Sequence, residues 1–338
     1  MSDASSYNRS RILPDANELV DNILKGDRVA LGRAITLIES KRKEHQDIAE
    51  RVIDACIPHS GNSLRIGITG TPGVGKSTFI EAMGSLLTKD GKKVAVLAID
   101  PSSQISKGSI LGDKTRMEQL SRDPLAFIRP SPAGESLGGV ARKTRETIIL
   151  CEAAGYEHVF IETVGVGQSE ITVHSMVDLF LLLLIPGAGD ELQGIKRGIV
   201  EMADIVAVNK SDGERLELAK KSKRAYINAL HLFPPKESDW TPKVELCSAT
   251  DKTGIEEIWT AVGDFQSHVI ENGWLQENRK RQAKFWFMET IKDSLFSSFF
   301  QNPAIQATFH TMEEQVLESQ ISPFKAAHDL LKKFLPEG

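Results

Sequence analysis

The chain has 338 residues, of which 41% are hydrophobic and 26% charged, so it can hold one large domain with smaller additions. Its formal net charge of −5 argues against a nucleic-acid partner, which normally requires a basic face. The longest apolar run, 179–185, is too short to cross a bilayer, and the polar N-terminus lacks a secretory signal. We therefore expect a cytoplasmic protein without a membrane partner.

The cysteines also argue against a metal site. Cys56, Cys151 and Cys247 are far apart in the sequence, and none pairs with another cysteine or a histidine at metal-ligand spacing. An odd number of cysteines in a chain without a secretory signal indicates reduced, structural thiols. No zinc or nickel site is predicted.

The first part of the chain, residues 1–62, is predicted to be a helical segment. Apolar residues recur at helical spacing from Asp15 to about His59, and Gly26-Asp27 marks a break between helices. Asp15, with Glu18 three residues later, is typical of a capping box. The stretch 58–62 is predicted to be a linker.

The middle part, residues 63–271, alternates short apolar runs with helical patterns. Continuous apolarity indicates strands buried on both faces, which predicts an α/β fold with a mainly parallel P-loop NTPase sheet covered by helices on both faces. The predicted strands are 64–70, 93–100, 125–130, 158–163, 178–185, 204–209 and 243–248. The predicted helices are 77–89, 115–122, 139–154, 194–202, 214–232 and 254–271.

The last part, residues 272–338, is again helical and carries many large apolar side chains, among them Trp286, Phe296 and Phe300. So short a segment cannot enclose these side chains by itself. We expect it to pack on the main domain or on another copy of the chain.

A glycine-rich loop between the first strand and the following helix is the strongest functional signal. It fits the pattern G-x-x-x-x-G-K-[S/T], whose backbone amides surround phosphate oxygens at the start of a helix. In this pattern the lysine contacts the β- and γ-phosphates and the serine hydroxyl binds Mg²⁺. The predicted nucleotide-binding residues of this loop are Gly70, Thr71, Pro72, Gly73, Val74, Gly75, Lys76, Ser77 and Thr78.

A second motif, Asn209-Lys210-Ser211-Asp212, follows a strand at the edge where open α/β sheets bind ligands. The Asp212 carboxylate can accept hydrogen bonds from guanine N1 and its amine, which adenine does not offer. Asn209 can meet guanine N7 and O6, and the stem of Lys210 can lie along the base. The motif predicts GTP rather than ATP, although such a tetrapeptide alone is often a polar turn. Ser248, Ala249 and Thr250 fit a second base-contacting loop.

Acidic residues end two of the predicted strands, Asp100 and Glu162. A carboxylate beside a phosphate loop can hold Mg²⁺ directly or through water. Asp113 is a third candidate, suited to the attacking water or to the metal. The alternatives are a helix cap or a turn-forming acid for Asp100 and Glu162, and an N-cap of the helix predicted from Thr115 for Asp113.

Two glycine-rich loops at strand ends are predicted to respond to the γ-phosphate, although each could equally be a passive connection. The candidate residues of the first loop are Gly165, Gly167 and Gln168. Those of the second loop, which is more charged, are Asp190, Gln193 and Lys196.

Together these segments resemble the SIMIBI-class P-loop GTPases of the MeaB/ArgK/MMAA family. The resemblance runs from about residue 12 to the C-terminus and is most specific in 64–212. It implies a GTP-hydrolysing chaperone of adenosylcobalamin-dependent methylmalonyl-CoA mutase, which gates cofactor loading and protects the enzyme. It also implies a homodimer in which the C-terminal segment is the dimerisation arm.

The resemblance further implies roles for individual residues. Lys76, Asp113 and Glu162 would be catalytic, and Ser77, Asp100 and Glu162 would surround Mg²⁺. The loop at 186–196 resembles a switch through which the mutase stimulates hydrolysis, with Asp190 and Lys196 the expected coupling residues.

Two other functions remain open at this level. A metal-insertion GTPase is disfavoured because its clustered cysteines or histidines are not found in this sequence. A regulatory kinase linked to transport of lysine, arginine and ornithine is discounted, because the residues offer no separate phospho-acceptor machinery.

Overall fold

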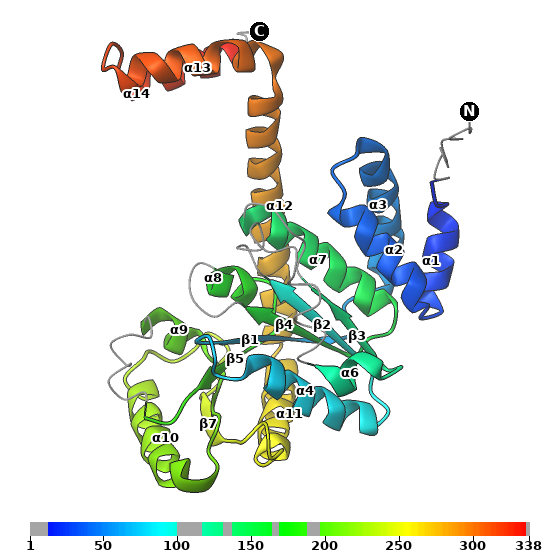
Figure 1. The fold of residues 1–338 in the computed structure, drawn as a ribbon, viewed down its shortest axis with the longest axis vertical. Coiled ribbons are helices and arrows are strands. Elements are labelled where there is room, and N and C mark those ends of the chain that lie inside the picture. The colour runs from blue at the N-terminus through cyan, green and yellow to red at the C-terminus, as the bar shows by residue number, and fades with distance from the viewer. Residues whose placement is uncertain (1–12, 100–116, 131–136, 164–168, 188–196, 336–338) are drawn as a thin grey trace, which may run out of the picture. The chain divides into compact units, whose positions relative to one another are not determined.

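A computed structural model describes residues 13–99, 117–130, 137–163, 169–187 and 197–335. The chain divides into two compact units, Met1–Lys280 and Arg281–Gly338. The first unit is built on a sheet of seven parallel strands, in the order β3-β2-β4-β1-β5-β6-β7 among the described residues (Figure 1). The strands are β1 Leu64–Gly70, β2 Val94–Ile99, β3 Ala126–Arg129, β4 His158–Thr163, β5 Leu179–Leu184, β6 Ile205–Val208 and β7 Lys243–Leu246.

The sheet is covered by helices on both faces, because its central strands are apolar on both sides. Strand β5, for example, is buried at every position. The helices of this part of the chain are α4 Lys76–Lys89, α6 Glu118–Arg122, α7 Leu137–Ala153, α8 Ser169–His174, α9 Arg197–Met202, α10 Leu216–Leu230 and α11 Ile255–Glu271, with a 3-10 turn η3 at Gly213–Arg215.

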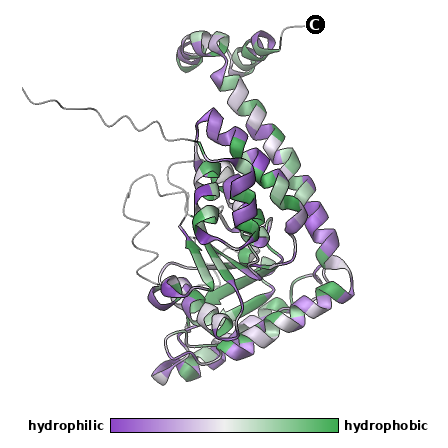
Figure 2. Cartoon of the chain, turned by 90° about the vertical axis from the view of Figure 1, so that its right-hand side faces the viewer, coloured by the Kyte–Doolittle hydropathy of each residue, from purple (hydrophilic) through white to green (hydrophobic). Residues whose placement is uncertain are grey.

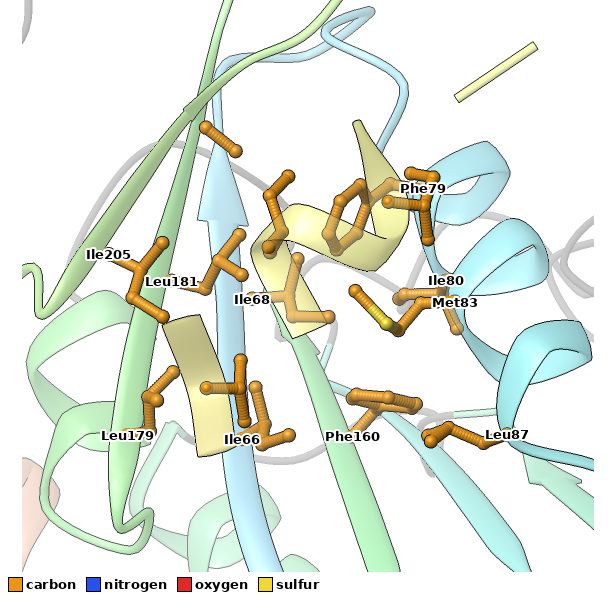
Figure 3. Packing of buried hydrophobic residues seen from close by; sticks show 14 of the residues in the cluster. Ile66, Ile68, Phe79, Ile80, Met83, Leu87, Phe160, Leu179, Leu181 and Ile205 are labelled. Atoms are coloured by element: carbon orange, nitrogen blue, oxygen red, sulfur yellow. The ribbon is translucent and has the colours of Figure 1, made fainter. Parts of the chain in front are cut away.

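The main core lies between helix α4 and the sheet. Ile68 of β1 points towards Ile80 and Met83 of α4, and Phe160 of β4 closes the cluster near Leu87 (Figure 3). These side chains are almost completely inaccessible to solvent. Burying each contributes about 1.5–3 kcal/mol, so the helix that follows the glycine-rich loop is fixed firmly on the sheet.

Three helices precede the sheet: α1 Ala16–Leu24, α2 Arg28–Glu39 and α3 Lys43–Cys56. Asp15 caps α1 by accepting hydrogen bonds from the amides of Asn17 and Glu18, and Asp27 caps α2 in the same way. Both boundaries agree with the predicted cap and break. The predicted linker begins within a 3-10 turn, Ile57–His59. Helices α2 and α3 pack on α7.

The last helices are α12 Trp274–Gln301, α13 Pro303–Leu317 and α14 Pro323–Phe334. Within Arg281–Gly338, Ile305 is fully buried, whereas Phe287, Phe296 and Phe324 are 65%, 67% and 90% exposed. Figure 2 shows apolar residues interleaved with hydrophilic ones along these helices. The unit therefore leaves a large apolar surface open. No helix in the described ranges is long and apolar enough to span a membrane.

The predicted fold class is confirmed, and all seven predicted strands are present with ends shifted by at most two residues. The helices differ more at their starts. The helix predicted from Thr115 begins at Glu118 with Met117 at its N-cap position, so Asp113 is not the N-cap residue of this helix. The short helix α8 was not among the helices predicted between strands.

Candidate active site

The glycine-rich loop connects the end of β1 to the start of α4, as predicted. Two of its glycines are required by close contacts. Gly70 has φ 150°, and a Cβ atom there would lie 2.5 Å from the carbonyl oxygen of Leu183. Gly75 has φ 97°, and a Cβ atom would lie 2.8 Å from Nδ2 of Asn209. Only glycine fits these positions, so the loop can bring its amides together at the helix N-terminus.

Lys76 is held across this loop. Its Nζ donates a hydrogen bond to the carbonyl oxygen of Gly70 at 2.8 Å and a longer one to that of Thr71 at 3.4 Å. The residue is only 8% exposed. Its ammonium group is thus fixed at the loop, where it can exchange these carbonyl contacts for phosphate oxygens.

Ser77 and Glu162 meet beside the loop. The Ser77 hydroxyl donates to Oε1 of Glu162 at 3.0 Å, and Glu162 is 9% exposed. Strand pairing explains the contact, because Glu162 of β4 lies opposite Ile68 of β1. A hydroxyl and a carboxylate are the hard oxygen ligands that Mg²⁺ prefers, so the pair fits the predicted magnesium position. In the part of the chain that the structure describes, no cluster of three His, Cys, Asp or Glu side chains is found.

A second pair joins strands β1 and β4 directly. The hydroxyl of Thr163 donates to Oγ1 of Thr69 at 2.9 Å, and each residue is 1% exposed. Thr69 directly precedes Gly70, and Thr163 directly follows Glu162. The pair therefore fixes the separation between the phosphate loop and the carboxylate. Sequence reasoning missed both residues, because the contact depends on the pairing of β1 with β4, which the sequence pattern did not predict.

Asn209 and Lys210 reach back to the phosphate loop. Nδ2 of Asn209 donates to the carbonyl oxygen of Val74 at 2.8 Å, and its Oδ1 accepts from the amide of Ala249 at 3.0 Å. Nζ of Lys210 donates to the carbonyl oxygen of Gly73 at 2.8 Å. Each end of the Asn209 amide group thus has a protein partner. The motif joins the phosphate loop to the base-side loop, a role that was not anticipated.

The carboxylate predicted to select guanine is oriented by a neighbour. Oδ2 of Asp212 accepts a hydrogen bond from the hydroxyl of Ser248 at 2.7 Å, and Ser248 is 1% exposed. The Ser248 oxygen in turn accepts from the amide of Asp251 at 3.3 Å. The loop after β7 is closed by an antiparallel bridge between Ser248 and Thr253. The two predicted base-contacting segments are therefore in direct contact.

Several predicted site residues lie outside the described residues, and their contacts are not stated. They are Asp100, Asp113, Gly165, Gly167, Gln168, Asp190, Gln193 and Lys196. The strands that precede Asp100 and Gly165 are among the described residues. Ile99 at the end of β2 is paired with Thr163 at the end of β4. Strands β2 and β4 therefore end on the same side of the sheet as β1, whose end begins the phosphate loop.

The parallel sheet, the glycine-rich loop and the ordered Asp212 carboxylate define a P-loop nucleotide-binding protein of the guanine-selective type. The chain belongs to the family described as methylmalonyl-CoA mutase-associated GTPase MeaB, whose model matches residues 31–304. It is a GTPase and binds guanine nucleotides.

Individual relatives are similar in sequence to almost the full chain. GTPase ArgK of Escherichia coli strain K12 is 45% identical over 306 residues, covering 90% of this chain and 92% of the relative. The mitochondrial methylmalonic aciduria type A homolog of Mus musculus is 46% identical over 328 residues, covering 94% and 79%. A crystal structure of a LAO/AO transport system kinase is 38% identical with a TM-score of 0.75, covering 95% and 97%.

Proposed function

We propose that this GTPase is a chaperone of an adenosylcobalamin-dependent acyl-CoA mutase, most simply methylmalonyl-CoA mutase. It gates loading of the cofactor and protects the enzyme. The observation that carries the proposal is the match of the mutase-associated GTPase family over residues 31–304, and the contacts of Lys76 and Asp212 support it. The apolar surface of the C-terminal unit adds a place for protein contacts.

The proposed nucleotide site uses the residues that the structure brings together. Backbone amides of residues 70–78 bind the phosphates, Lys76 neutralises charge on the β- and γ-phosphates, and Asp212 selects guanine. Ser248 supports this selection from its hydrogen bond at 2.7 Å. Thr250 and Ala249 complete the base-side loop.

Mg²⁺ is proposed to bind between Ser77 and Glu162, with Asp100 as a third oxygen ligand. The hydrogen bond that Ser77 donates to Glu162 supports this position, because it brings the two oxygens together. When bound, the ion supplies charge stabilisation for the departing diphosphate. The chain's own part is to hold these oxygens in place, which the Thr69–Thr163 pair assists.

For hydrolysis, Asp113 or Glu162 is proposed to orient the attacking water. Loops carrying Gly165, Gly167 and Gln168, and Asp190, Gln193 and Lys196, are proposed to couple the nucleotide to the mutase. Turnover by the chain alone is expected to be slow and to rise when the partner binds, as in other GTPases that rely on a partner to complete the site.

A homodimer is proposed to form through the C-terminal helices. Phe285, Leu295 and Phe296 are 47%, 57% and 67% exposed. Exposing such side chains to water is unfavourable, and a second copy of the chain would cover them. In this proposal residues 63–271 carry the GTPase, 1–62 extend it, and 272–338 form the dimerisation arm.

The direct test is GTP turnover measured with and without purified methylmalonyl-CoA mutase. The proposal expects a complex between the two proteins and a faster release of phosphate. If no complex forms and the rate is unchanged, the chaperone function is wrong while the GTPase itself stands.

One observation favours a second candidate. The similar solved structure is that of a LAO/AO transport system kinase, which favours a kinase linked to transport. A kinase would transfer the γ-phosphate to a protein target. Radiolabelled GTP therefore separates the two candidates, because the chaperone yields free phosphate and the kinase yields labelled protein.

A further inference from the structure

The backbone pairing of β1 with β4 ends where the candidate active site begins. The last pair is Ile68 with Glu162, whereas β1 stays paired with β5 up to Gly70 and β4 stays paired with β2 up to Thr163. Directly beyond the last pair, the hydroxyl of Thr163 donates to Oγ1 of Thr69 at 2.9 Å. A side-chain hydrogen bond thus joins the two strands where their backbone pairing stops.

This threonine pair lies on the opposite face of the sheet from the bond between Ser77 and Glu162. Successive residues of a strand point to opposite faces. Glu162 faces α4, because it accepts from Ser77 at 3.0 Å, and Thr163 therefore faces away from α4. Gly67 faces α8, since a Cβ atom there would lie 2.9 Å from a valine side chain of that helix, and Thr69, two residues on, faces the same way. One side-chain link is therefore present on each face.

The two links differ in what a bound cation would do to them. A cation held by Ser77 and Glu162 would use both oxygens as ligands, so their present hydrogen bond is not a permanent link. The bond between Thr69 and Thr163 uses neither oxygen, and each threonine is only 1% exposed, so water does not compete for it. Thr69 directly precedes Gly70 of the phosphate loop, and Thr163 directly follows Glu162. The threonine pair can therefore hold the two chain ends together with or without a cation.

The separation of the two proposed ligand oxygens suits a small cation. Oγ of Ser77 and Oε1 of Glu162 are 3.0 Å apart. Neighbouring oxygens of a Mg²⁺ octahedron lie about 2.8–3.0 Å apart, because Mg–O distances are about 2.0–2.1 Å. Around Ca²⁺, with Ca–O distances of about 2.3–2.6 Å, the same octahedral arrangement needs about 3.3–3.7 Å. Ca²⁺ would have to move the two oxygens apart, and the threonine bond would resist this movement.

We propose that the Thr69–Thr163 pair determines the cation selectivity of the nucleotide site, by keeping the ligand oxygens at the spacing that Mg²⁺ requires. Neither threonine touches the cation, so both are positioning residues. The inference rests on the proposed Mg²⁺ role of Ser77 and Glu162. It adds a determinant of metal choice that neither the phosphate-loop motif nor the family match assigns.

Four variants separate selectivity from stability. Thr163→Val leaves the hydroxyl of Thr69 buried without this partner, which is destabilising, whereas Thr69→Val/Thr163→Val removes both hydroxyls and should recover much of the stability. Thr163→Ser keeps the donor. Thr147→Val in α7 is the matched control, because Thr147 is 5% exposed and its hydroxyl donates within its own helix at 2.8 Å.

Calorimetry measures the binding of Mg²⁺ and of Ca²⁺ to each protein saturated with a non-hydrolysable GTP analogue. In Thr163→Val and in the double variant, the ratio of Mg²⁺ affinity to Ca²⁺ affinity should fall about tenfold, the lower end of the range for residues that orient metal ligands. Thr163→Ser and Thr147→Val should keep the wild-type ratio. Affinity for the analogue in EDTA should be nearly unchanged in all four variants, and melting temperatures without nucleotide report stability separately.

A wild-type ratio in the double variant overturns the inference, even if both cation affinities fall together. A large loss of analogue affinity in EDTA also overturns it, because the pair would then maintain the phosphate loop rather than the cation site. Glu162→Gln distinguishes failure of the inference from failure of the proposed site. If Glu162→Gln binds Mg²⁺ as tightly as the wild type, the proposed site and the inference are both wrong. If it binds Mg²⁺ weakly and the double variant keeps the wild-type ratio, only the inference is wrong.

Discussion

Arg279 and Asp178 form a buried bidentate ion pair at the base of the sheet. Nε of Arg279 lies 2.8 Å from Oδ1 of Asp178, and Nη2 lies 2.6 Å from Oδ2. The Asp178 side chain is fully buried. Burial lowers the pKa of Arg279, but the hydrogen bond to Asp178 and its charge outweigh this effect and raise it. The first turns of α12 are thereby bound to the nucleotide-binding unit.

We predict that Arg279→Ala strongly destabilises the first unit. The substitution leaves the Asp178 carboxylate buried with only the amide of Arg65 as a remaining described partner, at 2.9 Å. Breaking one side of a buried pair costs about 3–5 kcal/mol. Urea unfolding measures the loss. Lys280→Ala is the control, because its pair with Glu277 is largely exposed and contributes about 0–1 kcal/mol.

The same contact determines where the chain should be cut to test the proposed dimerisation arm. A chain ending at Lys280 keeps Arg279 and should remain a folded GTPase that sediments as a monomer. A chain ending at Glu271 loses the ion pair and should unfold more easily or aggregate. Analytical ultracentrifugation and unfolding curves on both chains separate the effects. An unaltered dimer in the chain ending at Lys280 would show that the arm is not the dimer contact.

Lys76→Ala should abolish GTP hydrolysis. The substitution removes the ammonium group that is held 2.8 Å from the carbonyl oxygen of Gly70. In phosphate loops this charge stabilises the transferred phosphate, so the expected loss is at least about 100-fold in kcat. Phosphate release measures it, with Lys89→Ala, at the exposed far end of α4, as the control. Full activity of Lys76→Ala would exclude this loop as the active site.

Base selection should depend on Asp212 and on the hydroxyl that orients it. In Asp212→Asn, the new side-chain amide can donate to the carbonyl group that xanthine has in place of the exocyclic amine of guanine. The binding preference should therefore shift from GTP to xanthosine triphosphate. Ser248→Ala should weaken GTP binding about tenfold, because it removes a charge-assisted hydrogen bond of 2.7 Å. Calorimetry measures both affinities, with Thr260→Ala in α11 as control. An unchanged guanine preference in Asp212→Asn would refute the assignment.

Acid sensitivity should depend in part on His158. Burial lowers the pKa of this histidine from 6.5 to about 4. Between these values the unfolded chain binds the proton and the folded chain does not, so the free energy of unfolding falls as pH falls from 6.5 towards 4. The loss amounts to about 2 kcal/mol by pH 4.5.

His158→Phe is the variant that tests this origin. It keeps a ring against Trp259, whose centroid lies 5.0 Å away, and removes the titrating group. Urea unfolding at neutral and acidic pH should show a smaller acid loss in the variant than in the wild type. Equal acid sensitivity in the two proteins would show that groups other than His158 cause the loss of stability at acidic pH.

The sheet was predictable because its strands are short apolar runs whose ends are marked by glycine or polar residues. Strand β1, for example, has the predicted bounds of Leu64 and Gly70. The phosphate loop was predictable because its mechanism demands fixed residue types at fixed spacing. The start of α6 was not predictable, since its cap comes from Glu81, about 40 residues away in the sequence.

The same distinction between local pattern and distant contact holds for the candidate site. The motif identified Asp212, but its orientation by Ser248 depends on two strands lying side by side. The Thr69–Thr163 pair depends likewise on the pairing of β1 with β4. Such contacts arise from register, which the pattern of one strand does not contain.

The amide of Asn209 has a further consequence for the energetics of binding. Because it joins Val74 to Ala249, the loop proposed to bind the triphosphate and the loop proposed to bind the purine are already connected to each other. A binding site that is preorganised in this way loses little conformational entropy on binding. Because binding of one piece then has little left to order for the other, guanosine and pyrophosphate, offered as separate pieces, should bind nearly independently.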